Sequence, residues 1–415
     1  EANIEPEAIG RLAESAVIFA SSTEEEHNKT ALELVTLLYE SARDLYPGLA
    51  DLMKMVCTRL GNIPTVDLLE NNDSLPISLN VEIEATLREQ TVRISSQSLK
   101  MTRFQMQSYK LLSEGKTVSL SAPTSAGKSF LITQFVADKF LHTQTLNALL
   151  IVPTRALIRQ FTQDFYDVFD SHGIEIRGTG QKVRSVQVDL VTSSVRVEGR
   201  EVSPHTLFIL TQERLQSIIY NWKPSPKFEL IIVDESQKVS DASRGILLED
   251  TILDIASSRM TQSVFLSPLT SNPQFFLNLI GVFATDQAIQ TNLSPVAQHI
   301  YSVSTARGNR RQLIVDKLNM GLAGFTYNIP LHESMPSEIY KRMAFAAEIL
   351  GRGANNLLYA NRPSDAERMA LELASRIQVN TEPSADIEET VDFLSEMIHE
   401  DYHLNGCLRK GVGYH

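Results

Sequence analysis

The strongest restriction on the fold comes from an alternation of short apolar runs with helical stretches, which begins near Leu99. Each run is followed by polar loop residues and then by a segment with helical spacing. Strands that are buried on both faces of a parallel sheet look like this, because helices cover both sides. The pattern predicts an α/β fold with a parallel sheet. The runs are Val118-Ser-Leu, Ala148-Leu-Leu-Ile-Val, Leu207-Phe-Ile-Leu, Leu230-Ile-Ile-Val and Val264-Phe-Leu.

A further β-rich stretch lies between Gly173 and Pro204 and includes Ser185-Val-Gln-Val-Asp-Leu-Val. It falls outside the regular alternation of strand and helix. We therefore predict an added hairpin or insertion at this place.

The chain before residue 99 has helical periodicity. Residues 31–43 and 51–60 place apolar side chains at helical spacing, and Gly61 directly after the second segment predicts a C-terminal cap. We expect a helical accessory region over residues 1–98 and a first α/β domain over residues 99–290.

Length and composition limit the kind of protein. The 415 residues are enough for two or three domains. We find no long apolar run and no signal peptide, and Cys57 and Cys407 have no metal-ligand spacing. These features predict a cytoplasmic protein without membrane contact. The net charge of −12 counts mildly against a nucleic-acid binder, although a local basic groove can lie on an acidic protein.

The segment Ser121-Ala-Pro-Thr-Ser-Ala-Gly-Lys-Ser129 stands between a strand-like and a helix-like stretch. A loop with Gly-Lys-Ser in this position is typical of phosphate binding, because amides at a helix start attract anions. Lys128 would reach the β- and γ-phosphates of ATP, and the Ser129 hydroxyl would bind Mg²⁺. The alternative is a chance Gly-Lys-Ser at a helix start. The predicted nucleotide-binding residues of the loop are Pro123, Thr124, Ser125, Ala126, Gly127, Lys128 and Ser129.

A second segment, Leu230-Ile-Ile-Val-Asp-Glu-Ser-Gln237, ends an apolar strand with two carboxylates. Ligands bind at the carboxyl ends of strands in open α/β sheets. We predict that Asp234 holds Mg²⁺ and that Glu235 orients and deprotonates the attacking water. The alternative is an acidic turn after a strand.

Together these segments resemble the superfamily 2 helicases, and most of all the DExH-box helicases of the superkiller (Ski) type. That group has Pro-Thr-x-x-Gly-Lys-Ser/Thr, which Pro123 to Ser129 matches, so Ala122 in place of a first glycine fits the group. The resemblance implies two RecA-like domains with ATP and Mg²⁺ between them. It also implies that Gln105, after Phe104, reads the adenine edge; the alternative is an ordinary polar helix residue.

Further segments match the family in order. Val152-Pro-Thr-Arg-Ala-Leu157 and Thr211-Gln-Glu-Arg214 resemble its motifs Ia and Ib. The resemblance places Arg155, Thr211 and Arg214 at the phosphates of a nucleic acid, where contacts carry no sequence information. The alternative is that Thr211 caps a helix and Arg214 makes a surface ion pair. Asp241-Ala-Ser-Arg-Gly-Ile-Leu-Leu-Glu249 resembles the Ski-type continuation Asp…Arg-Gly…Glu.

Two positions depart from the family pattern. Gln237 stands where the family has histidine, and Ser267-Pro-Leu stands where it has Ser-Ala-Thr, so a threonine hydroxyl is missing unless Thr270 supplies it. The resemblance gives both Gln237 and Ser267 a role in coupling hydrolysis to strand separation. We expect intact hydrolysis chemistry and a weakened coupling.

The rest of the chain resembles the start of a second motor domain. We expect a linker over residues 291–335 and the beginning of a second RecA-like domain over residues 336–415. Ser294 to Ile300 resembles the family's linker, and Leu357-Leu-Tyr-Ala-Asn-Arg-Pro-Ser364 resembles motif IV, with a strand at Leu357 and a helix from Ser364 to Ile377. Gly411 to His415 resembles the segment that follows motif IV. Motifs V and VI, with the arginine fingers, are not in the sequence, so the segment alone should hydrolyse ATP poorly.

Three functions remain open at this stage. The first is an ATP-dependent helicase or translocase, with DNA favoured over RNA, although phosphate recognition permits both. The second is a nucleic-acid sensor that controls a partner effector such as a nuclease; the stretch Arg59 to Pro64 resembles helicase subunits of Hachiman-type anti-phage systems. The third is an ATPase-inactive scaffold, against which the intact Lys128, Asp234 and Glu235 argue.

Overall fold

The computed structural model describes residues 6–70, 91–177, 186–193, 204–222, 225–256, 261–294, 300–318, 326–351, 353, 355–377 and 383–414. These residues form two compact units, residues 1–297 and 298–415. Each unit is described by itself.

The first unit begins with a helical bundle. Its apolar positions recur at helical spacing, and Ala16, Val35 and Val56 are fully buried in its core. The third helix ends at Gly61, which has a left-handed backbone and donates its N–H to the Thr58 carbonyl at 3.0 Å, so the predicted cap is confirmed. The helices are α1 (Pro6–Ala20), α2 (Glu25–Ala42), α3 (Gly48–Leu60) and α4 (Ile63–Glu70).

An eight-stranded sheet follows, with the order β10-β3-β9-β8-β4-β7-β6-β5 and parallel pairing throughout. All five apolar runs of the sequence are strands of this sheet, which confirms the predicted α/β fold. The strands are β3 (Val118–Ser121), β4 (Leu146–Ile151), β5 (Ile174–Ile176), β6 (Val186–Val191), β7 (His205–Leu210), β8 (Leu230–Val233), β9 (Gln262–Ser267) and β10 (Ala288–Gln290).

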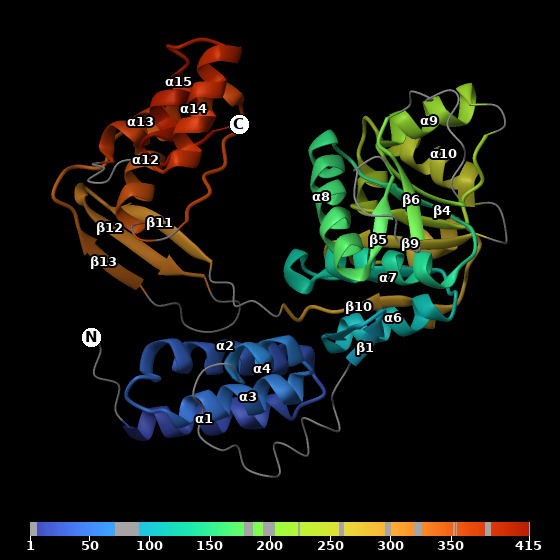
Figure 1. Cartoon of the computed structure of the whole chain (residues 1–415). Coiled ribbons are helices and arrows are strands. Elements are labelled where there is room, and N and C mark those ends of the chain that lie inside the picture. The colour runs from blue at the N-terminus through green and yellow to red at the C-terminus, as the bar shows by residue number, and fades with distance from the viewer. Residues whose placement is uncertain are drawn as a thin grey trace. The chain divides into compact units, whose positions relative to one another are not determined.

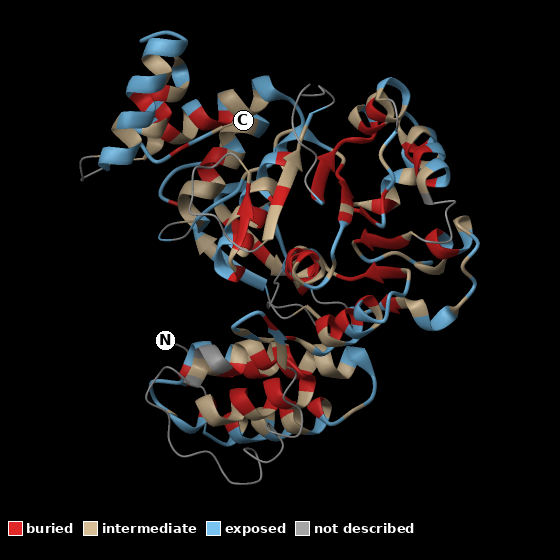
Figure 2. Cartoon of the chain, turned by 45° about the vertical axis from the view of Figure 1, so that its right-hand side comes forward, coloured by how far each residue is buried: buried red, intermediate tan, exposed pale blue. Residues whose placement is uncertain are grey.

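Helices cover both faces of this sheet (Figure 1). Alternate residues of a strand face opposite sides, so Leu150 packs with α6, α7 and α8, whereas Leu149 packs with α9, α10 and α11. Figure 2 shows the buried residues concentrated on the strands between these layers. The helices are α6 (Arg103–Ser113), α7 (Lys128–His142), α8 (Arg155–His172), α9 (Gln212–Asn221), α10 (Gly245–Ala256) and α11 (Gln274–Leu279).

The hairpin predicted between Gly173 and Pro204 is wrong. The described residues there form β5 and β6, which pair in parallel and extend the central sheet beyond β7. A strand near the margin of a sheet is covered less completely, and β6 is mostly half-buried. An alternation of apolar and polar residues, as in β6, is therefore expected both for a hairpin strand and for a strand near the edge of a parallel sheet.

A short hairpin joins the bundle region to the sheet region. Its strands are β1 (Thr91–Ile94) and β2 (Gln97–Lys100), and Ile94 is fully buried in the core that α6, α7 and α8 share with the sheet. The predicted boundary after residue 98 therefore falls inside β2. Because this hairpin packs against the core of the α/β region, it is part of that region.

The second unit differs from the sequence prediction in two respects. Residues predicted as a linker form an antiparallel sheet of three strands, β11 (Tyr301–Ala306), β12 (Asn309–Lys317) and β13 (Thr326–Pro330). Leu357 is 99% exposed and pairs with no described strand, so the predicted strand there is wrong. Three apolar residues do not make a strand without a hydrogen-bonded neighbour. Residues 295–299 and 415, named in the sequence predictions, lie outside the described residues.

Four helices complete the described part of the second unit: α12 (Ile339–Leu350), α13 (Pro363–Arg376), α14 (Ala385–Met397) and α15 (His403–Leu408). The helix predicted from Ser364 to Ile377 is confirmed by α13. Arg376 of α13 pairs with Glu333 at 2.8 Å and with Glu348 at 3.1 Å, and it lies over the Phe345 ring. This cluster holds α13 against α12 and the segment before it.

Candidate active site

The phosphate-loop segment lies between β3 and the start of α7. Residues 124–126 form a single 3-10 turn, and Gly127 has a φ of 73° before Lys128 begins the helix. The left-handed backbone at Gly127 favours glycine, and a Cβ atom there would lie 2.4 Å from the Gln105 amide nitrogen, so the Gln105 side chain would have to move. The loop therefore presents the amides of a helix start, as anion binding requires.

Lys128 is 9% exposed and its ammonium group contacts the loop itself. The Nζ atom donates to the carbonyl oxygens of Ala122, at 2.5 Å, and Pro123, at 2.9 Å. Burial lowers the pKa of Lys128, while the charges of Asp234 and Glu235 raise it in part. The lysine thus lies within the electrostatic reach of both carboxylates that the sequence predicted to join it.

Asp234 and Glu235 follow β8 at the same edge of the sheet as the phosphate loop. Burial, and then the charge of Glu235, raise the pKa of Asp234 to about 6. Glu235 has a φ of 51°, a left-handed conformation that is uncommon for a residue other than glycine. Such strained positions cluster at functional sites.

β9 lies between β3 and β8 in the sheet, so its end lies between the phosphate loop and the segment of Asp234 and Glu235. Ser267 is 1% exposed, and its backbone carbonyl accepts from the Ala122 N–H at 3.3 Å. The Ser121 hydroxyl donates to the Pro268 carbonyl at 3.1 Å, and the Thr270 hydroxyl lies 3.4 Å from the Ser121 hydroxyl. Thr270 therefore contacts the end of β3, the strand that precedes the phosphate loop. Its role in coupling, which the sequence left open, stays a prediction.

Gln237 lies beside the predicted general base. Its amide nitrogen donates to the Glu235 carboxylate, and its amide oxygen is buried without a hydrogen-bond partner among the described residues. A neutral amide thus orients Glu235 at the place where the family carries histidine. The coupling role predicted for Gln237 and Ser267 stays a prediction.

Gln105 joins α6 to the phosphate loop. Its amide nitrogen donates to the carbonyls of Ala126 and Gly127, each at 3.3 Å, and its amide oxygen accepts from the Thr102 N–H at 2.9 Å. With 6% of its surface exposed, the side chain supports the loop in this conformation. The role predicted for it at the adenine edge stays a prediction.

The oxygen atoms at this edge fit Mg²⁺. Ser129 would offer a hydroxyl and Asp234 a carboxylate, and Mg²⁺ prefers such oxygen ligands together with phosphates and water. Burial, and then the charge of Glu235, raise the pKa of Asp234 to about 6, and a bound cation would favour its ionised form. The described residues hold no group of three or more His, Cys, Asp or Glu that could bind a metal ion.

The predicted nucleic-acid contacts lie at the starts of two helices. Arg155 is exposed at the first position of α8, and Thr211 is buried before α9. Arg214 donates to the Thr192 carbonyl, so the alternative of a surface ion pair does not describe it. β4 and β7 are neighbouring parallel strands, and the helices that follow them therefore begin at one edge of the sheet.

Arg244, for which the sequence predicted no contact, connects these helices. Arg244 donates to Glu213 of α9 at 2.8 Å and to the Pro153 carbonyl, just before α8, at 2.9 Å. The Gln212 amide donates back to the Arg244 carbonyl at 3.2 Å. The Arg-Gly pair in the segment Asp241 to Glu249 was a visible signal, but its link to α8 and α9 depends on tertiary structure.

No helix among the described residues combines the length and the apolar character that crossing a membrane requires.

Comparison with known proteins agrees with this site. Residues 102–270 match the family model described as DEAD/DEAH box helicase. The chain is 27% identical over 179 residues to Antiviral helicase SKI2 of Saccharomyces cerevisiae, covering 43% of this chain and 12% of that protein. It is 23% identical over 348 residues to DExH-box ATP-dependent RNA helicase DExH9 of Arabidopsis thaliana, covering 75% of this chain and 32% of the relative.

A third relative is ATP-dependent DNA helicase Hel308 of Methanococcus vannielii, 23% identical over 232 residues, with 50% of this chain and 29% of the relative covered. The matches to these three relatives span 12%, 32% and 29% of their lengths. Residues 102–270 are therefore similar to the DEAD/DEAH box helicases, and the relatives of low identity include DExH-box helicases.

Proposed function

We propose that the chain is the ATP-binding part of an ATP-dependent nucleic-acid helicase or translocase. The observation that carries this proposal is the meeting of Lys128, Asp234 and Glu235 at one edge of the sheet, each within electrostatic reach of the others. The match of residues 102–270 to the helicase family supports it.

The residues divide the chemistry between them. The loop amides and Lys128 would bind the phosphates, and Glu235 would orient a water molecule and take its proton. Ser129 and Asp234 would hold Mg²⁺, which when bound neutralises charge on the phosphates. Gln237 keeps the Glu235 carboxylate in position through its hydrogen bond.

A nucleic acid would bind across the starts of α8 and α9. Arg155 is exposed there, and helix starts attract phosphate groups. The relatives' names include both a DNA helicase and an RNA helicase, which supports a nucleic acid as the track. We propose DNA as the favoured track and RNA as the alternative. Residues 336–415 would begin the second motor domain.

We propose a sensor as the alternative function, in which ATP hydrolysis controls an effector such as a nuclease. The name of the yeast relative includes the word antiviral, which supports a proposed role in anti-phage defence for this chain. The third hypothesis is an ATPase-inactive scaffold. The presence of Lys128, Asp234 and Glu235 argues against this hypothesis.

The test is ATP hydrolysis by the full-length protein with and without single-stranded DNA, duplex DNA and RNA. We expect stimulation by at least one nucleic acid, because the predicted track lies on the same domain as the ATP site. Hydrolysis without any stimulation would favour the sensor that needs its partner. No hydrolysis under any condition would favour the scaffold.

Arg244→Ala should raise the nucleic-acid concentration needed for half-maximal ATPase stimulation by about five- to tenfold, since it removes two hydrogen bonds that hold the starts of α8 and α9. The maximal rate should change less, because Arg244 positions these helices and does not contact the ATP loop. Titration of ATPase rate with single-stranded DNA measures both quantities. Glu213→Gln keeps the Pro153 bond and should have a smaller effect; an equal loss in both variants would contradict the role of that bond.

A further inference from the structure

The hairpin of β11 and β12 in the second unit carries three arginines at its tip, residues 307–311 (Figure 1). Arg307, Arg310 and Arg311 are exposed, and so are Gly308 and Asn309 between them. No guanidinium group of the three makes an ion pair or a hydrogen bond with another described residue. The tip therefore presents positive charge that the described part of the unit does not neutralise.

Other cations of the second unit have carboxylates beside them. Arg409 pairs with Glu388 at 3.1 Å, and Lys341 pairs with Glu338 at 3.3 Å. Arg376 contacts three glutamates. Pairing with a neighbouring acid is thus a frequent arrangement in this unit, and the hairpin tip departs from it.

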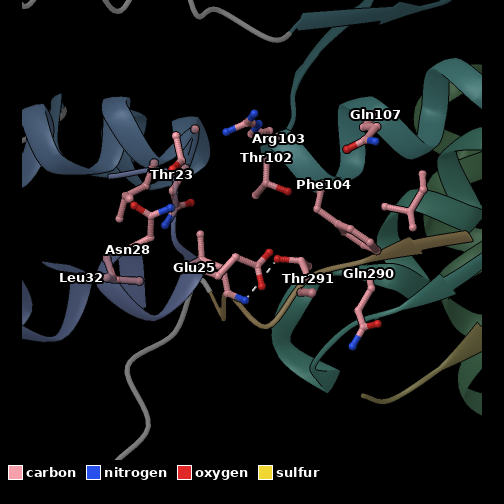
Figure 3. Close-up of a pocket in the computed structure, with 16 residues that line it drawn as sticks. Thr23, Glu25, Asn28, Leu32, Thr102, Arg103, Phe104, Gln107, Gln290 and Thr291 are labelled. Carbon is pink, nitrogen blue, oxygen red and sulfur yellow. Dashed lines mark hydrogen bonds between the residues drawn. The ribbon is translucent and has the colours of Figure 1, made fainter. Parts of the chain in front are cut away.

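The arginines of the first unit that were described above also have contacts. Arg244 and Arg214 donate to groups of their own unit. Arg103 borders a cavity of about 280 Å³ between the helical bundle and the start of α6, where Figure 3 shows it together with Thr102 and Glu25. The guanidinium groups of the hairpin tip, in contrast, are open to solvent.

The charge of the second unit is distributed unevenly along the chain. Residues 301–330 contain four Lys and Arg and one Asp, whereas residues 331–415 contain eight Lys and Arg and fourteen Asp and Glu. The positive charge thus belongs to the three-stranded sheet, and the helical part is acidic. A local basic surface on an acidic protein attracts polyanions to one place.

The backbone of the tip is anchored to the core of the unit. The pairing of β11 with β12 shifts in register at the tip, and the resulting bulge contains Arg310 and Arg311. The Arg310 carbonyl accepts from the Met335 N–H and the Arg311 carbonyl from the Leu331 N–H, each at 2.8 Å. Leu331 and Met335 are buried with Phe345 of α12. The tip is therefore ordered before it binds, which lowers the entropic cost of binding.

The composition of the tip fits phosphate groups better than a protein surface. A guanidinium group donates two parallel hydrogen bonds to a phosphate. Residues 307–311 contain no apolar side chain, whereas the buried centre of a protein–protein interface is apolar. Interfaces with nucleic acids are more polar and more positively charged. These properties favour a nucleic acid over an acidic protein as the partner.

We propose that the hairpin tip binds the phosphate backbone of a nucleic acid through Arg307, Arg310 and Arg311. This inference rests on the nucleic-acid function proposed above and adds a contact outside the starts of α8 and α9. Contacts to phosphates carry no sequence information, so the tip binds strands of any sequence.

The test measures the binding of a fluorescent single-stranded DNA of mixed sequence to the full chain, by anisotropy at several salt concentrations. The variant combines Arg307→Gln, Arg310→Gln and Arg311→Gln. Each phosphate contact adds about 0.7 to the slope of log affinity against log salt, so the slope should fall by about 2. Affinity near 0.1 M salt should fall by about tenfold to a hundredfold.

The matched control combines Arg11→Gln, Arg342→Gln and Arg368→Gln. These arginines lie on α1, α12 and α13, are exposed and form no ion pair with another described residue. The control removes the same charge, so its affinity should stay within about twofold of the unaltered protein and its salt slope should not change. Thermal unfolding of both variants should match the unaltered protein, because exposed side chains alone are changed.

An unchanged salt slope in the hairpin variant would overturn the inference while the unaltered protein still binds DNA. Equal losses in the hairpin variant and the control would also overturn it, since net charge alone would then explain the binding. Polyglutamate that binds as tightly as DNA and is lost in the hairpin variant would assign the tip to an acidic protein instead. Failure of the unaltered protein to bind DNA or RNA would overturn the proposed function together with the inference.

Discussion

Glu235→Gln should reduce the rate of ATP hydrolysis by about a hundredfold to ten-thousandfold while ATP binding stays intact. The substitution keeps the shape of the side chain and removes the group that takes the proton from water. The amide oxygen of the new residue can still accept the hydrogen bond from Gln237. The loss therefore measures proton transfer and not a change of loop geometry.

Near pH 6, binding in this variant should become tighter. Burial and then the charge of Glu235 raise the pKa of Asp234 to about 6. Without that charge the pKa of Asp234 falls, so a larger fraction of Asp234 is ionised near pH 6 and can hold Mg²⁺. Single-turnover hydrolysis and ATP binding, measured on the same preparation, separate the two effects.

Glu229→Gln is the matched control for this measurement. Glu229 directly precedes β8, at the opposite end of the strand from Glu235, and its carboxylate accepts from the Asn147 N–H at 2.7 Å. An amide oxygen can accept the same bond, so hydrolysis should stay within about twofold of the unaltered protein. If Glu235→Gln behaved like Glu229→Gln, the catalytic role of Glu235 would be refuted and the hypothesis of an ATPase-inactive scaffold would be favoured.

The sequence was sufficient where local chemistry decides the structure. Leu230-Ile-Ile-Val is apolar at every position, and only a strand covered on both faces buries all four side chains. The helix start at Lys128 was equally predictable, because Gly127 directly before it can adopt the left-handed backbone that the turn needs. Phosphate binding by this loop stays a prediction.

Tertiary contacts account for what the sequence did not show. The alternation in Val186 to Val191 fits a hairpin and a sheet margin alike, and only its pairing with β7 distinguishes them. The sequence marked Arg244 only as part of a motif, and its hydrogen bond to Pro153 joins it to a neighbour far away in the chain. No local pattern encodes this neighbour.

Lys128→Ala should abolish measurable ATP hydrolysis, with a loss of about a thousandfold or more, because it removes the cation that we propose to bind the β- and γ-phosphates. It also leaves the Ala122 and Pro123 carbonyls without their present donor. Lys128→Met keeps most of the side-chain volume without the charge, so an equal loss in both variants would assign the effect to charge. Recovery of hydrolysis in the methionine variant alone would assign it to packing of the loop.

The pH dependence of the remaining ATP binding gives a second readout of the same variant. The Lys128 charge lowers the pKa of Asp234, so its removal raises that pKa further above about 6. Asp234 is then protonated in a larger fraction near neutral pH and ionises only as the pH rises. Binding of ATP with Mg²⁺ by Lys128→Ala should therefore strengthen from about pH 6 to about pH 8 more steeply than in the unaltered protein. An identical pH profile in both proteins would mean that Lys128 and Asp234 do not interact, and that the carboxylate and the loop do not form one site.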